Sequence, residues 1–157
     1  MRRLNTITLV WRNVRRHAER IASEFAIDGR LLQEHIERAT KHPVDLASPI
    51  GWTNPDHLRQ YARRLLLIAK PVLPSGRREL LVCPECADLG CGCLSAEIHI
   101  AEGQVTWSEL GHVNNYDPES LTIFGIGAFV FRLDEYEGLL KGYAAVEGST
   151  ATESGGK

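Results

Sequence analysis

Long apolar runs are missing from this sequence, and none approaches the roughly 20 residues that a membrane-spanning helix needs. The chain begins with Arg2 and Arg3 but reaches Trp11 without the long apolar stretch or the small-residue cleavage site of a signal peptide. These absences predict a cytoplasmic protein with no membrane partner.

Recognisable catalytic motifs are missing as well. The sequence contains no G-x-S-x-G nucleophile turn, no phosphate-binding loop and no dinucleotide-binding fingerprint. Its six histidines are scattered, and no two of them stand at the H-x-x-x-H spacing that places both on one helix face. The sequence therefore favours a protein that binds a partner over an enzyme.

The chain has little excess of either charge, and its composition is ordinary. Lys and Arg number 18 against 20 Asp and Glu, and 43% of the 157 residues are hydrophobic. These values are typical of one soluble globular domain. We expect a single α+β domain over residues 1–147 and a flexible tail over residues 148–157, since GSTATESGGK offers nothing large to bury.

The small net charge conceals two ends of opposite sign. Residues 1–20 hold six arginines and one glutamate, whereas residues 109–157 hold eight acidic and three basic residues. Such polarity steers a charged partner, although charge runs are also common on solvated surfaces that bind nothing. An isoelectric point near 6.3 and the lack of a second basic stripe argue against nucleic acid. The residues predicted to contact a protein partner are Glu109, Asp117, Glu119, Asp134, Glu135 and Glu137.

Hydrophobic periodicity predicts strands and helices in a mixed order. Asp28 is a candidate cap for the first helix, and Asn54 followed by Pro55 marks the start of the second. The predicted strands cover residues 6–11, 24–27, 80–83, 94–100, 105–110 and 121–131, the last as one bent strand or two short ones, and the predicted helices cover residues 29–40, 55–70 and 134–143. The fold class is therefore α+β: a mostly antiparallel sheet with two central helices and a C-terminal helix.

All four cysteines fall in one segment, Cys83-Pro-Glu-Cys86-Ala-Asp-Leu-Gly-Cys91-Gly-Cys93. Four thiolates complete a closed tetrahedral Zn²⁺ site, with His99 or His112 as a substitute ligand. In an extended stretch, however, Cys91 and Cys93 point to the same face about 6.6 Å apart, and both must lean inward to share a metal. Small buried thiols packed within a hairpin are the alternative.

A thiol oxidoreductase that uses Cys83 and Cys86 as a C-x-x-C pair is the alternative function. A strand-like segment precedes Cys83, but the residues after Cys86 break a helix instead of starting one. Glu85 and Asp88 would also raise thiol pKa values rather than lower them. The sequence therefore gives this redox alternative little support.

The stretch LPSGRRELLVCPECADLGCGC resembles a group of small, mostly uncharacterised bacterial proteins with a CPECGDLGCG segment, some of which are labelled oxidoreductases. The later pattern FVFRLDEYEGLL resembles that group's closing strand and helix, so the resemblance covers roughly residues 55–142. Ala87 stands where the group has glycine, and Cys93 where it has a small residue other than cysteine. The resemblance implies an architecture, with three cysteines as the shared set, more than an activity.

The preferred functional interpretation is a small cytoplasmic protein-binding domain, most specifically an immunity-type protein that neutralises a bacterial toxin by direct binding. An acidic C-terminal region that faces a basic toxin domain would accelerate association and select that partner. Zn²⁺ is the one cofactor that the sequence suggests.

Overall fold

The computed structural model describes residues 3–114 and 116–144, with the exception of the side chain of Ala18. The predicted tail, residues 148–157, lies outside the described residues. The predicted α+β class is confirmed, with 25% helix and 41% strand. Within the described ranges, no helix has the length and apolar character needed to cross a membrane.

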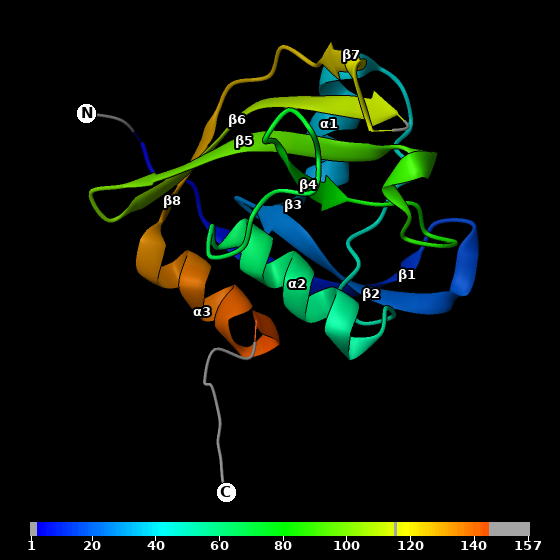
Figure 1. Ribbon diagram of the computed structural model, residues 1–157, viewed down its shortest axis with the longest axis horizontal. Coiled ribbons are helices and arrows are strands. Elements are labelled where there is room, and N and C mark those ends of the chain that lie inside the picture. Colours follow the sequence, from blue (N-terminus) through cyan, green and yellow to red (C-terminus); the bar gives the residue numbers. More distant parts are fainter. Residues whose placement is uncertain (1–2, 115, 145–157) are drawn as a thin grey trace, which may run out of the picture.

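The strands form two antiparallel sheets, one with the order β1-β2-β3 and one with the order β4-β5-β6-β7, in which β8 also pairs with β6 (Figure 1). The sequence predicted a single sheet, whereas the structure has two, because β1 pairs with β2 along its whole length and these strands form a separate sheet with β3. The elements in chain order are β1 (Ile7–Val14), β2 (His17–Ile27), β3 (Arg30–Leu31), α1 (Leu32–Thr40), α2 (Pro55–Leu65), β4 (Arg78–Leu81), the short helix η1 (Leu89–Cys91), β5 (Cys93–Ala101), β6 (Gln104–Asn114), β7 (Asp117–Ile123), β8 (Phe129–Arg132) and α3 (Leu133–Ala144).

The core fills the space between the two sheets and the helices. Trp107 of β6 meets Phe25 of β2 edge to face, with ring centroids 5.3 Å apart, and it also contacts Phe131 of β8 and Tyr136 of α3. The Tyr136 hydroxyl accepts a hydrogen bond from Trp107 Nε1 and donates one to the carbonyl of Leu65 in α2. All of these side chains are buried, so this cluster joins the two sheets to α2 and α3.

The start of the second helix is confirmed, and the start of the first is not. Asn54 Oδ1 accepts a hydrogen bond from the backbone N–H of His57, and Pro55 occupies the first helical position of α2. Asp28 does not cap α1, because it lies in the turn between β2 and β3, where its Oδ1 accepts the N–H of Thr6 at 2.9 Å. The residues that follow Asp28 form β3, which pairs with β2 before α1 begins.

The second helix ends earlier than predicted. α2 stops at Leu65 because Leu67 adopts a left-handed conformation, with φ of 62°. The Arg78 guanidinium then donates to the carbonyls of Arg64 and Ala69, at 2.7 and 3.0 Å. These bonds satisfy carbonyls that further helical turns would otherwise have used.

The strands predicted over residues 94–100 and 105–110 are confirmed as β5 and β6, which form a hairpin with Glu102 and Gly103 at its turn in left-handed conformations. The segment predicted as one bent strand or two short ones, residues 121–131, contains the end of β7 and most of β8, which both lie on one edge of β6, and β7 begins outside it, at Asp117. β8 pairs with the end of β6 near Gln104, and β7 pairs with the opposite end near Asn114. The connection between them places residues 122–124 beside His112.

Candidate metal centre

The cysteine segment is a loop between β4 and β5. The loop turns back at its start, where the N–H of Ala87 donates to the carbonyl of Cys83 at 2.9 Å. It turns again in η1, where Asp88 Oδ1 accepts the N–H of Gly90 at 2.8 Å. These two turns bring the first three cysteines to one point.

The sulfur atoms of Cys83, Cys86 and Cys91 all lie within 4.8 Å of one another. Those of Cys86 and Cys91 are 3.5 Å apart, and no disulfide is formed. A tetrahedral Zn²⁺ ion with Zn–S bonds of about 2.3 Å has sulfur–sulfur edges of about 3.8 Å. The observed sulfur–sulfur distances therefore differ from this edge length by a few tenths of an ångström to one ångström. Small shifts would bring the three sulfurs into a zinc-binding arrangement.

The electrostatics of the cluster favour a bound cation. Burial disfavours the Cys83 thiolate, but hydrogen bonds from the backbone N–H groups of Glu85 and Cys86 and from the thiols of Cys86 and Cys91 outweigh it and lower the pKa of Cys83. The pKa of Cys91 is raised to about 11, because Cys91 forms a hydrogen bond with Cys86 and lies near the negative charge of Cys83. Three neighbouring thiols thus resist joint ionisation, which a metal ion overcomes by binding the thiolates.

Cys93, which the sequence analysis included among the ligands, is not part of this group. It begins β5 and is completely buried, packed with Val82, Leu89 and Val113. Burial raises the pKa of Cys93 to about 12. The fourth cysteine is therefore a core residue, in agreement with the alternative that it is a small buried thiol.

The proposed substitute ligands lie outside the group as well. His99 is exposed and pairs with Thr106, toward the other end of the β5–β6 hairpin. His112 is nearer: a Cβ atom on Gly92 would approach its ring to 3.0 Å. Within the described part of the chain, no fourth His, Cys, Asp or Glu atom joins the three sulfurs.

Two residues that the sequence did not single out flank the loop. His17, at the start of β2, has its Nε2 4.0 Å from a carboxylate oxygen of Glu85. The Tyr116 hydroxyl lies 3.4 Å from Asp88 Oδ1. No sequence signal could have found them, because the pairs are 68 and 28 positions apart. The β1–β2 turn and the start of β7 therefore border the cysteine loop.

The acidic residues predicted to bind a partner do not form one surface. Asp117 and Glu119 lie at the start of β7, next to the cysteine loop. Asp134, Glu135 and Glu137 lie in α3, which follows β8 at the opposite end of β6. An 11-residue strand spans about 35 Å, so the length of β6 separates the two groups.

Glu109 stands apart from both groups. It lies in β6, has a left-handed φ of 53° and is exposed. Its carbonyl accepts a hydrogen bond from the buried Arg77, which also donates to the hydroxyl and carbonyl of Ser95. Glu109 therefore marks the bulge where β5 and β6 shift register, and Arg77 fastens that bulge.

The structure supports the resemblance to the bacterial group only in its cysteine cluster, since Cys83, Cys86 and Cys91 are the three cysteines of the shared pattern. No family model matches the chain, and neither a curated protein nor a solved structure is similar enough to match it.

Proposed function

We propose that this protein is a small protein-binding domain in which Cys83, Cys86 and Cys91 hold a Zn²⁺ ion. The observation that carries the metal is the spacing of the three sulfurs, all within 4.8 Å of one another. Zinc would bind them as thiolates and fix the loop between β4 and β5. Ala87 and Leu89 of this loop are buried, whereas the side chains of Cys86 and Cys91 are exposed, so a metal would stabilise the part of the loop that packing leaves to solvent.

The donors suit zinc better than a hard cation. Thiolates are soft ligands that select Zn²⁺, Cu⁺ or iron–sulfur clusters over Mg²⁺ and Ca²⁺. Backbone N–H groups donate hydrogen bonds to the Cys83 sulfur. In metal sites, such hydrogen bonds hold the ligand atoms in the orientation that binds the metal. Water supplies the fourth ligand, because the exposed side chains of Cys86 and Cys91 leave that side open to solvent.

Metal content tests the site directly. Elemental analysis of protein purified without chelators is expected to give about one zinc per chain, the stoichiometry of a single tetrahedral centre. A folded protein that contains no metal and takes up none from zinc-buffered solution would refute the site.

We further propose that the partner is a protein, most specifically a basic toxin domain that this immunity-type protein neutralises. The acidic residues beside the cysteine loop, Asp117 and Glu119, support it, because neither has an ion pair among the described residues. Asp134 is a weaker candidate, since Arg132 lies 2.8 Å from its carboxylate and offsets its charge. Glu135 and Glu137 of α3 also have no ion pair among the described residues, so the choice of the loop end rests on its place beside the proposed zinc loop.

Charge reversal distinguishes the two ends. Asp117→Lys with Glu119→Lys is expected to weaken rescue of growth from the toxin encoded beside this gene at least tenfold, because electrostatic attraction to a basic surface is lost. The matched variant, Asp134→Lys with Glu135→Lys, should leave rescue within about twofold. If neither variant changes the rescue, or if the gene has no toxin neighbour, the acidic surface does not bind such a partner.

A thiol oxidoreductase is the second candidate, because the same three sulfurs are close enough to exchange a disulfide. Alkylation by iodoacetamide separates the two functions. In the zinc protein, Cys86 and Cys91 should be protected until a chelator is added, whereas buried Cys93 should stay unreactive throughout. A metal-free protein in which Cys83 and Cys86 cycle reversibly between dithiol and disulfide would favour the oxidoreductase instead.

A further inference from the structure

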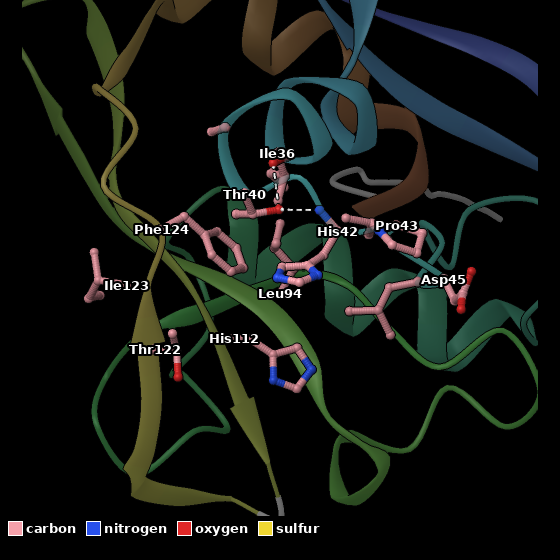
Figure 2. A pocket seen from close by; sticks show the side chains of 13 residues that line it. Ile36, Thr40, His42, Pro43, Asp45, Leu94, His112, Thr122, Ile123 and Phe124 are labelled. Carbon is pink, nitrogen blue, oxygen red and sulfur yellow. Dashed lines mark hydrogen bonds between the residues drawn. The ribbon is translucent and has the colours of Figure 1, made fainter.

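A pocket of about 470 Å³ lies between the end of α1, the loop that follows it and the β6–β7 edge of the second sheet (Figure 2). Its floor is formed by Ile36 of α1 and Leu94 of β5, which are both almost completely buried. His42, His112 and Phe124 form its walls. This volume lies within the range of small-molecule sites, which is about 300–1,000 Å³.

The outer wall of the pocket, residues 42–46, is held in a fixed position. Glu37 of α1 accepts the N–H of Val44 at 2.6 Å and a hydrogen bond from Arg15 at 2.7 Å. Arg15 also donates to the carbonyl of Val44, at 3.2 Å. Gln33 Nε2 donates to the carbonyl of Leu46. The pocket is therefore preformed, so a ligand need not order this loop on binding.

Three rings from three different parts of the chain face the pocket. Figure 2 shows the side chains of His42, His112 and Phe124 turned toward it. Aromatic rings pack well against a flat aromatic ligand, in stacked or edge-to-face contact. The imidazoles also offer hydrogen-bonding nitrogens, as does the hydroxyl of Thr122.

The pocket carries no unbalanced charge that would select an ion. Asp45, its one carboxylate, lies 3.8 Å from both Arg15 and Arg16. Burial lowers the pKa of His112, which keeps that ring neutral at neutral pH. A charged ligand would lose its hydration here without gaining an opposite charge.

We propose that this pocket binds an uncharged small molecule with a planar aromatic ring system and one hydrogen-bonding substituent. The site is separate from the three sulfurs and from the acidic residues of the proposed partner surface, so it depends on neither proposal. His112 links the pocket to the cysteine loop, through its close approach to Gly92.

2-Naphthol is the probe, and amide chemical shifts of the ¹⁵N-labelled full chain are the measurement. We expect shifts confined to residues 36–46, 94, 112 and 122–124, with a dissociation constant of about 0.1 mM for a ligand of this size. 2-Naphthoate, which has the same rings and a negative charge, should bind at least fivefold more weakly.

A variant that fills the pocket tests whether 2-naphthol binds at this site. Ala39 lines the pocket but is exposed on α1, so Ala39→Trp fills the space without disturbing the core. It should weaken 2-naphthol binding at least tenfold, whereas Ala101→Trp, at the far end of the β5–β6 hairpin, should not change it.

Three results would overturn the proposal. One is the absence of pocket shifts at 1 mM 2-naphthol with the protein folded, about ten times the expected constant. Another is equal binding by the Ala39→Trp variant or by 2-naphthoate. The third is a change in the pocket shifts when the ligand-free protein is diluted, which would assign the pocket to a second copy of this chain.

Discussion

Cys86→Ser is expected to abolish zinc binding, reducing the metal from about one ion per chain to less than about a tenth of that. A serine hydroxyl is a poor zinc ligand, and two thiolates on one loop cannot hold the ion against a competing chelator. The side chain of Cys86 is exposed, so the substitution removes a ligand at almost no cost in packing. The measurement is zinc content after dialysis, together with circular dichroism to show that the fold is retained.

Cys93→Ala is the matched control. The side chain is completely buried, so its removal should lower the free energy of unfolding by about 1 kcal/mol while leaving the zinc content unchanged. The two variants thus differ in metal content: Cys86→Ser loses the zinc together with the stabilisation that zinc gives the loop, whereas Cys93→Ala keeps the zinc and loses stability through packing in the core. Loss of zinc from the folded Cys93→Ala variant would restore the four-cysteine site that the sequence suggested.

Cys91 and Cys93 do not lie as they would in an extended chain. An extended chain would place Cys91 and Cys93 on the same face. Instead, Cys91 ends η1, and Gly92 turns the backbone with a left-handed φ of 97° before β5 begins at Cys93. The two sulfurs therefore point into different environments, one into solvent and one into the core.

The resemblance predicted the cysteine set better than the spacing did. Three cysteines are common to the bacterial pattern, and the same three sulfurs converge in the structure. At the position where that pattern has glycine, this chain adopts a backbone conformation that favours glycine. Ala87 adopts a left-handed φ of 62°, a conformation that glycine reaches without the steric cost of a Cβ.

Local signals predicted the elements, whereas the arrangement of the two sheets and the surroundings of the site required the folded chain. Asn54 and Pro55 predicted the start of α2, and the alternation of apolar residues from Leu94 to Ile100 predicted β5. Nothing local shows that β1 pairs with β2 and β8 with β6, because pairing depends on which edges remain free. The separation of the acidic residues follows from this topology, so a charge count along the sequence could not detect it.

Arg64→Ala is expected to lower the free energy of unfolding by about 3–5 kcal/mol, the usual cost of leaving a buried charge without its partner. Arg64 lies in α2, and its guanidinium reaches the Glu79 carboxylate of β4 at 2.6 Å. The Glu79 side chain is only 2% exposed, and its other oxygen, Oε1, already lacks a hydrogen-bond partner in the described structure. Without the guanidinium, the Glu79 carboxylate stays buried under α2 with no ion-pair partner. Urea denaturation measures the loss.

Arg59→Ala tests whether burial of the ion pair, and not its short distance, causes the loss of stability. Arg59 lies in the same helix and pairs with Asp56 at the same 2.6 Å distance. Asp56 is 87% exposed, so the loss should be only about 0.2–1 kcal/mol. Adding Glu79→Gln to Arg64→Ala should recover part of the lost stability, since a neutral amide costs less to bury than an unpaired carboxylate. Equal losses in the two arginine variants, or no recovery in the double variant, would mean that the buried charge does not cause the destabilisation.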